Sequence, residues 1–185
     1  MSPILLASGS PRRKELLTLL DIPFKTFSTD VDESIPQETA PAEAAEQLAF
    51  RKANAAFQTH RDHVVIGCDT IVVHDGVILG KPADHEEARR TLTKLSGHTH
   101  LVYTGVCIMS EGKTICFHEK TSVTFWKLTD TDINKYIESG DPFDKAGSYG
   151  IQGKAALFVK EIKGDYYNVV GLPISRLARE LAHFR

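Results

Sequence analysis

Apolar and polar positions along the chain follow two periods, one typical of helices and the other typical of strands. The apolar run at 3–7 predicts a short buried strand, and the leucines after Pro11 recur at helical spacing as far as residue 20. Ser10 belongs to the residue types that cap a helix, and proline suits the first helical position. We therefore expect a strand, a Ser-Gly-Ser-Pro turn and a helix at the start of the chain.

The same two patterns predict the remaining elements. The alanine-rich segment 40–60 places small apolar residues on one helical face, and Asp75-Gly76 is a typical hairpin turn. Alternating helices with inserted strand-turn-strand steps predict an α/β fold with a mixed sheet. Further helices are expected at 83–97, 129–142 and 173–184, strands at 24–28, 63–82, 100–110 and 114–127, two strands within 156–172, and loops at 29–39 and 144–156.

Composition narrows the class of protein. A chain of 185 residues that is 42% hydrophobic and 25% charged is typical of one globular domain, and no linker divides residues 1–185. The net charge of −2 argues against a general nucleic-acid binder, and no apolar run is long enough to cross a membrane. Three cysteines without a C-x-x-C motif indicate neither a disulfide framework nor a zinc site. We expect buried cysteines in a soluble protein of the reducing cytoplasm.

Positive charge gathers at the start of the first predicted helix. Arg12, Arg13 and Lys14 come directly after the Ser-Gly-Ser-Pro turn. The unpaired N–H groups of a helix start are already partially positive, so further cations there suit an anion such as phosphate. The alternative is a solvated basic turn that pairs with nearby acids.

Carboxylates occur at two places that suit a cation. Asp69 interrupts an apolar run, where its charge is costly unless it is paired or binds a cation. A loop with Asp30, Asp32 and Glu33 offers further carboxylates, and Mg²⁺ usually takes one or two of these together with phosphate oxygens. The alternatives are an aspartate at a turn, where the strand leaves the sheet, and a solvated acidic loop.

Two lysines complete the candidate chemistry. Lys52 lies within the alanine-rich segment, and Lys81 follows a predicted strand in the motif LGKP, which lacks the spacing of a Walker A loop. The alternative for each is an ordinary surface lysine. Taken together, the basic helix start, the carboxylates and the lysines suit a polyphosphate with a divalent cation, and hence phosphoryl or nucleotidyl hydrolysis.

Six motifs in order carry a resemblance to a known family: ASGSPRRKELL, LAFRKA, GCDTIV, LGKP, AGSYGIQG and GDYYNVVGLPI. From residue 4 to about residue 184 the chain resembles the Maf family of nucleoside triphosphate pyrophosphatases. The resemblance implies a Maf or inosine-triphosphatase-like α/β fold, an elongated mixed sheet with a deep cleft between two lobes. It also implies hydrolysis between the α and β phosphates with a divalent cation (Mg²⁺, Mn²⁺ or Co²⁺), cytoplasmic clearance of non-canonical nucleotides and a link to septum formation.

The resemblance also implies roles for individual residues. The motifs SPRR and GIQG are similar to those of the dTTP/UTP subgroup, and the amide of a glutamine can both donate to and accept from a pyrimidine edge. The implied roles are Asp69 as the proton acceptor, Arg12, Thr70 and Gln152 at positions linked to substrate choice, Ser8, Arg13, Lys52 and Lys81 as further substrate-binding positions, and Glu33 with Asp69 as metal ligands.

A second function stays open beside the enzyme. The family name and the basic PRRK segment also fit a non-catalytic regulatory protein that binds partners and inhibits cell division. The expected partner of the enzyme is a nucleoside triphosphate, without direct nucleic-acid or membrane binding, and a homodimer is left open. For a regulator, binding should persist in an Asp69 variant, and a division phenotype that disappears together with catalysis would count against it.

Overall fold

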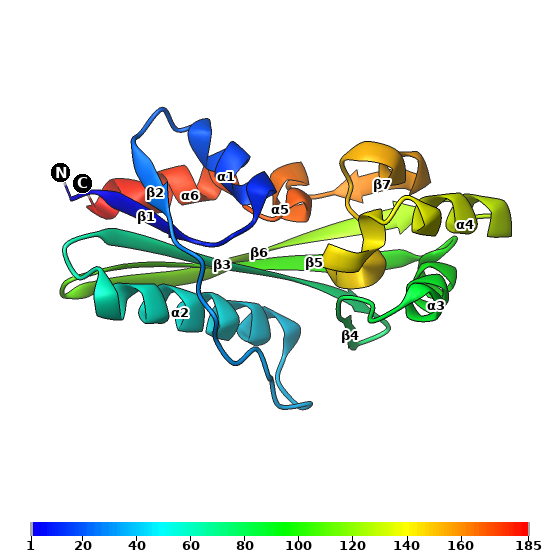
Figure 1. The fold of residues 1–185 in the computed structure, drawn as a ribbon, viewed down its shortest axis with the longest axis horizontal. Helices are drawn as coiled ribbons and strands as arrows, with labels where there is room; N and C mark the ends of the chain where they lie inside the picture. Colours follow the sequence, from blue (N-terminus) through cyan, green and yellow to red (C-terminus); the bar gives the residue numbers. More distant parts are fainter. Residues whose placement is uncertain (1, 185) are drawn as a thin grey trace. The chain divides into compact units, whose positions relative to one another are not determined.

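A mixed sheet of seven strands organises residues 2–184, the part of the chain that the computed structural model describes (Figure 1). The strand order is β2-β1-β3-β5-β6-β7, and β4 pairs with β3 outside this path. β1 is parallel to β2 and β3, whereas β4 and β7 are antiparallel to their neighbours. The strands are β1 (Ile4–Ala7), β2 (Phe24–Thr26), β3 (Val64–His74), β4 (Val77–Leu79), β5 (Thr99–Ser110), β6 (Lys113–Phe125) and β7 (Val159–Lys163).

The helices connect these strands and confirm the α/β class. They are α1 (Pro11–Thr18), α2 (Pro41–Thr59), α3 (His85–Leu95), α4 (Asp130–Glu138), α5 (Tyr166–Val170) and α6 (Ile174–Leu181), with 3₁₀ turns at Asp141–Asp144, Ala146–Ser148, Gly153–Phe158 and Ala182–Phe184. No helix of the described residues is both long and apolar enough to cross a membrane.

The chain folds into two compact units. The first unit holds the residues up to Thr70, residues 104–119 and the residues from Gly171 onward. The second unit holds residues 71–103 and 120–170. The expectation of a single domain with a cleft between two lobes stays a prediction.

In the first unit, α2 packs closely on β3 and β5. A Cβ atom on Gly67 would lie 2.3 Å from the carbonyl oxygen of Ala49, and one on Gly105 would lie 2.1 Å from that of Ala45. Contacts this short are impossible for a real Cβ, so glycine is what lets the backbone of α2 approach both strands. The two glycines thereby determine the short distance between α2 and the sheet.

In this unit α6 covers the face of β6 that lies opposite the face covered by α2 (Figure 1). Successive side chains of a strand point to opposite faces. His118 contacts Glu46 of α2 through Nδ1 and Oε1 at 2.6 Å, whereas the preceding Phe117 lies under the guanidinium of Arg176 at 4.5 Å. The strands of the first unit therefore lie between helices.

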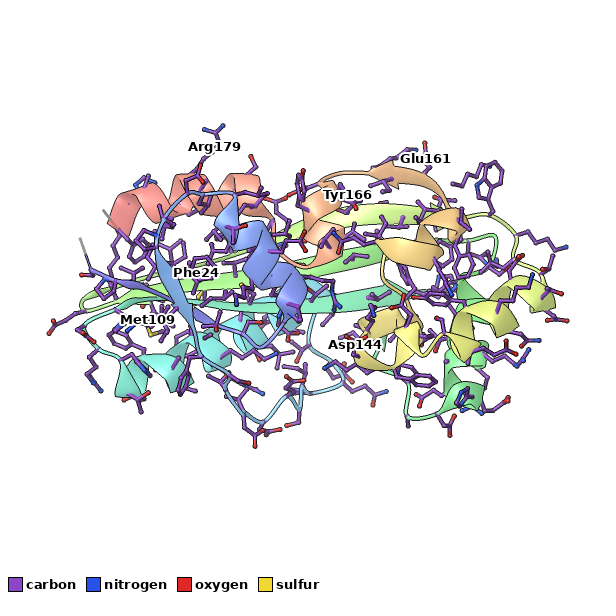
Figure 2. All side chains as sticks on the ribbon, turned by 45° about the horizontal axis from the view of Figure 1, so that its top comes forward. Phe24, Met109, Asp144, Glu161, Tyr166 and Arg179 are labelled. Carbon is purple, nitrogen blue, oxygen red and sulfur yellow. The ribbon has the colours of Figure 1, made fainter. Side chains whose placement is uncertain are left out.

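The core between α2 and the strands is built from small and sulfur-containing residues. Phe27, Phe57 and Cys116 pack against it from the edge, and Figure 2 labels one member of the core, Met109. Cys68 and Cys107 are fully buried, as expected for the cysteines, whereas Cys116 is only partly buried. The buried members of this core are Leu5, Ala7, Ala49, Ala53, Ala56, Val65, Cys107 and Met109.

Most of the predicted elements are confirmed to within a few residues, but the second of the two strands predicted within 156–172 is wrong. Its aromatic and β-branched sequence, YYNVV, forms α5 instead. Asn168 is fully buried in this helix, and its amide nitrogen donates to Val102 O at 3.1 Å and to Thr121 Oγ1 at 2.9 Å. The Asp165 carboxylate accepts from Tyr167 N at 2.8 Å where the helix begins. These contacts override the strand propensity of the segment.

Candidate active site

Lys52 joins two of the predicted site carboxylates in the first unit. Its Nζ atom lies 2.5 Å from Asp69 Oδ1 and 2.8 Å from Glu33 Oε1. The side chains of Lys52 and Asp69 are 13% and 11% exposed, whereas that of Glu33 is 55% exposed. The structure thus brings together a buried acid, a partly buried ammonium and an acid that faces solvent.

The position of Asp69 follows from the packing of α2. Asp69 lies in β3 directly after the buried Cys68, and its side chain reaches α2 because Gly67 permits the close approach of this helix. Among the described residues, Lys52 is the hydrogen-bond donor to Asp69, and it bonds Oδ1. Oδ2 is therefore available to a water, a cation or a substrate atom. The alternative of an aspartate where the strand leaves the sheet is wrong, since β3 continues to His74.

Arg51 holds the acidic loop that carries Glu33, a role that the sequence alone did not indicate. One amino group of its guanidinium donates to Asp32 O at 2.9 Å and to Ser34 O at 2.7 Å, the two carbonyl groups on either side of Glu33. The Asp32 carboxylate accepts from the backbone and hydroxyl of Ser34, which lowers its pKa. Asp32 therefore stabilises the turn of the loop, and Glu33 is the member of the loop that meets Lys52.

The guanidinium of Arg13 is bound by protein atoms on three sides. Nε donates to Gly171 O at 2.8 Å, one amino group donates to Thr70 Oγ1 at 2.9 Å, and the other lies 3.4 Å from Ser8 Oγ. The helix begins as predicted, with Ser10 as the N-cap and its side chain accepting from Arg13 N at 3.5 Å. Arg13 thus connects α1 with β3 and with the segment before α6.

Thr70 receives a second contact from a residue that the sequence did not single out. Its hydroxyl lies 2.9 Å from that of Thr104, which is fully buried on β5. Because Arg13 donates to Thr70 Oγ1, the hydroxyl hydrogen of Thr70 is directed toward Thr104 or toward a ligand. Arg12, the other arginine, is partly exposed at the same helix start.

Lys81 and Gln152 lie in the second unit, and both are exposed. Their two loops are linked, because Gly147 N donates to the carbonyl oxygen of Gly80 at 3.1 Å. Gly147 and Ser148 both have positive φ angles of 70° and 63°, so a left-handed turn leads toward Gln152. Ser148 was not among the expected residues, and a serine carries no sequence signal for this conformation.

Buried aromatic residues anchor the loop before Gln152. The hydroxyl of Tyr149 lies 2.6 Å from Nε2 of His100, and both side chains pack on Phe125. The hydroxyl of Tyr136 accepts from Gly150 N at 3.1 Å. Burial lowers the pKa of His100 to about 3, so its ring is neutral near pH 7 and is a structural hydrogen-bond partner.

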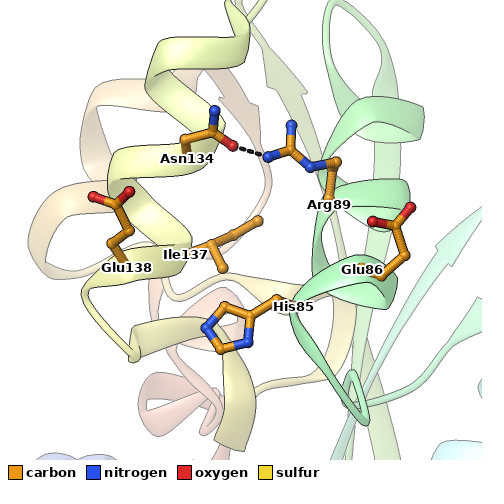
Figure 3. A pocket seen from close by; sticks show the side chains of 6 residues that line it. All are labelled: His85, Glu86, Arg89, Asn134, Ile137 and Glu138. Atoms are coloured by element: carbon orange, nitrogen blue, oxygen red, sulfur yellow. Dashed lines mark hydrogen bonds between the residues drawn. The ribbon is translucent and has the colours of Figure 1, made fainter.

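A small pocket in the second unit contains none of the predicted site residues (Figure 3). It lies between α3 and α4, with His85, Glu86 and Arg89 on one side, and its volume is about 250 Å³. Arg89 donates to Asn134 across it, so its cation is already partnered. We therefore place the candidate active site at Lys52 and Asp69.

The carboxylates near Lys52 fit a divalent cation that keeps other ligands. Across the described residues, no three His, Cys, Asp or Glu side chains come together as a metal site. Asp69 and Glu33 are hard oxygen donors held against one ammonium. Mg²⁺ suits such a pair, since it usually takes one or two carboxylates and completes its shell with phosphate oxygens and water.

Comparison with known proteins agrees with the resemblance of the motifs. The dTTP/UTP pyrophosphatase of Bacillus cytotoxicus is 55% identical over 184 residues, which are 100% of this chain and 96% of that protein. The protein of the same name from Bacillus cereus is 54% identical over the same shares. Among solved structures, the Staphylococcus aureus Ham1 protein has a similar fold, with a TM-score of 0.53, 14% identity and coverage of 99% of this chain and 100% of that one. A model of the family described as Maf-like protein matches residues 3–184, so the chain belongs to the Maf-like protein family.

Proposed function

We propose that this protein hydrolyses dTTP and UTP to the nucleoside monophosphate and pyrophosphate. The observation that carries the proposal is the ammonium of Lys52 held between Asp69 and Glu33. This cluster combines a base, a cation and a second carboxylate, which are the groups that a metal-assisted attack of water on a phosphate needs. The names of the Bacillus relatives support the choice of substrate.

Asp69 is the proton acceptor for the attacking water in this proposal. A carboxylate is a weak base near pH 7, so the attacking water needs activation as well. A divalent cation, when bound, would supply a water of lowered pKa and would neutralise phosphate charge. Asp69 and Glu33 would hold that cation, and Asp69 Oδ2 is the oxygen that Lys52 leaves open for the water proton.

Lys52 balances the two carboxylates and stabilises the charge of the triphosphate. Its Nζ atom contacts both carboxylates, so its charge would limit their repulsion of phosphate oxygens. Arg12, Ser8 and the N–H groups at the start of α1 supply further donors for phosphate oxygens. Lys81, an exposed lysine of the second unit, is a further phosphate-binding residue in this proposal, since an ammonium pairs with phosphate oxygens.

Arg13 takes a different role from the phosphate contact that the sequence suggested. Three of its nitrogen atoms already face protein oxygens, including the hydroxyl of Thr70. We propose that Arg13 orients Thr70, which with Arg12 and Gln152 selects the pyrimidine nucleotide. The amide of Gln152 offers a donor and an acceptor to the carbonyl and imide N–H groups of uracil or thymine.

We infer that the protein acts in the cytoplasm, where removal of dTTP, UTP and modified pyrimidine triphosphates limits non-canonical nucleotides and connects the enzyme with septum formation. A regulator that acts by binding alone would not need the buried ion pair of Lys52 and Asp69. The effect on cell division, in this proposal, follows from catalysis.

A panel of triphosphates tests the proposed reaction. The protein is incubated with dTTP, UTP, CTP, dATP and GTP in Mg²⁺ or Mn²⁺, and products are separated by anion exchange. We expect monophosphate and pyrophosphate, faster from dTTP and UTP than from the others, and loss of turnover with a chelator. Release of diphosphate and orthophosphate, or no turnover of any triphosphate, would contradict the proposal.

A further inference from the structure

The hairpin of β5 and β6 places two cysteines opposite each other. β5 ends at Ser110 and β6 begins at Lys113, so a two-residue turn joins them and pairs these two residues. Counting three pairs inward from that turn, Cys107 lies opposite Cys116. Both cysteines belong to the first unit.

Hydrogen bonds at the other end of the hairpin show the same register. Phe125 N donates to His98 O at 3.0 Å, and the hydroxyl groups of Thr99 and Thr124 lie 2.7 Å apart. Counting inward from Ser110 and Lys113 gives the same two pairs, Thr99 with Thr124 and His98 with Phe125. The register is therefore the same at both ends of the hairpin.

The alternation of the ladder determines how closely the two cysteines approach. Ser110 and Lys113 close the turn as a hydrogen-bonded pair, so Cys107 and Cys116 form a non-hydrogen-bonded pair. In such pairs the Cα atoms are about 4.5 Å apart and the side chains are closest. Disulfides need Cα atoms about 4.4 to 6.8 Å apart, so this pair meets the requirement without movement of the backbone.

The two thiols contact each other and differ in exposure. They share a hydrogen bond, which lowers the pKa of Cys116 and, together with burial, raises that of Cys107. Cys107 is fully buried, whereas Cys116 is partly exposed at the edge of the core. The titratable groups near the pair include Glu46 of α2, His118 beside Cys116 on β6, and Cys68 of β3 on the side of Cys107.

We propose that Cys107 and Cys116 form a reversible intramolecular disulfide when a hydroperoxide oxidises the protein. Cys116 is the attacking group because it is the less buried of the two residues and its pKa is the lowered one. Cys107 is the resolving group because it lies opposite and in contact. The modification is independent of the proposed hydrolysis, and it uses none of the groups assigned to that reaction.

The chemistry balances with the hydroperoxide as the oxidant. The Cys116 thiolate attacks the outer oxygen, the O–O bond breaks, and the products are a sulfenic acid and an alkoxide or hydroxide that takes a proton from solvent. The Cys107 thiol then attacks the sulfenic sulfur, and its proton leaves with the hydroxyl group as water. Two thiols and one hydroperoxide give one disulfide, one water and one alcohol, or two waters with hydrogen peroxide.

Cys68 is an internal control for this reaction. It is fully buried on β3, and burial raises its pKa to about 11. A thiol without solvent access and with so little thiolate reacts slowly with peroxide. Of the three cysteines, Cys68 should therefore keep its thiol while the other two lose theirs.

Mass spectrometry of the whole reduced protein tests the proposal. The chain is treated with hydrogen peroxide, blocked with iodoacetamide under denaturing conditions, and digested with trypsin. We expect a loss of about 2 Da in the intact mass, one alkylated cysteine, and a cross-link between peptides 95–113 and 114–120 that dithiothreitol reverses. The variant C68A should give the same cross-link.

Two single variants separate the roles of the pair. In C107A we expect stable oxygen adducts on Cys116 in place of the cross-link, and in C116A we expect Cys107 to stay reduced. The proposal is overturned if the folded wild-type protein keeps three alkylatable thiols, if Cys116 gains oxygen without a cross-link, or if it forms disulfides between chains. The wild-type measurement does not depend on the folding of any variant, so each of its outcomes either supports or overturns the proposal.

Discussion

Lys52 of α2 and Asp69 of β3 form an ion pair in which Nζ lies 2.5 Å from Oδ1. The two residues are 17 positions apart, and the close packing of α2 over Gly67 brings them together. Both side chains are largely shielded from water, so each charge depends on the other. The proposed activity and part of the stability of the first unit therefore rest on the same contact.

Replacing Lys52 with methionine should lower stability and turnover together. The K52M variant leaves the Asp69 carboxylate buried without its donor, which we expect to reduce the free energy of unfolding by about 1–3 kcal/mol. Urea denaturation measures the change, and K94M, at an exposed lysine of α3, is the control. The double variant K52M/D69N should lose less than the sum of the single variants. Strict additivity would show that the pair is not coupled.

Adding a methyl group at Gly67 or Gly105 should displace α2. The new Cβ would meet backbone atoms of α2 at 2.3 Å or 2.1 Å, and backbone cannot move aside as a flexible side chain can. We expect G67A and G105A to destabilise the protein by more than about 2 kcal/mol, as overpacking against rigid neighbours does. G80A is the matched control, since nothing lies within 4 Å of its Cβ. Thermal unfolding that is equal in all three variants would contradict the packing argument.

The positioning role of Arg13 predicts a particular result for R13K. Lysine keeps the positive charge but cannot donate to Gly171 O and Thr70 Oγ1 at once through a planar fork. We expect a loss of about 1–2 kcal/mol in stability and a smaller preference for dTTP over purine triphosphates. K14R, at an exposed neighbouring residue, should change neither. Unchanged stability with a higher KM for every triphosphate would instead indicate a phosphate contact.

His100 makes stability depend on pH in the acidic range. The folded protein keeps this ring neutral down to a pKa of about 3, whereas in the unfolded chain the ring binds a proton below about pH 6.5. The unfolded state therefore binds more protons between these values, and the contribution of His100 falls by up to about 1.4 kcal/mol for each pH unit of acidification. Urea titrations at pH 4.5 and 7.5 measure this slope.

The variant H100Q isolates that contribution. Its side chain can still bond the hydroxyl of Tyr149 but does not titrate. We expect a shallower loss of stability on acidification in H100Q than in the wild-type protein. Parallel slopes in the two proteins would mean that His100 is not the group that titrates on unfolding.

Local sequence signals predicted much of the fold. Ser10 and Pro11 predicted where α1 begins, and Asp75-Gly76 predicted the turn between β3 and β4, because a cap and a tight turn depend on neighbouring residues. The segment at α5 was predicted wrongly because its conformation depends on Asn168 and its partners on β5 and β6. Long-range contacts of this kind leave no periodic pattern in the sequence.

The candidate site, like the fold, could be predicted from the sequence only in part. Asp69 was noticeable because it interrupts an apolar run, and Lys52 and Glu33 were noted as separate features. The contact between these residues depends on the distance from α2 to the sheet, which Gly67 and Gly105 determine. No local sequence pattern encodes this distance. Arg51 and Thr104 escaped attention because an arginine on a helix and a threonine in a strand are ordinary. Their partners reveal their roles.

The most direct test of the central claim compares D69N with D62N in dTTP hydrolysis. Asp62 is an exposed aspartate that contacts His63, so the same chemical change there is the control. We expect D62N to match the wild-type rate and D69N to lose about two to four orders of magnitude in kcat, the usual effect of removing an acid–base group. Circular dichroism verifies that both variants are folded. A folded D69N that releases dTMP and pyrophosphate at nearly the wild-type rate would contradict the account.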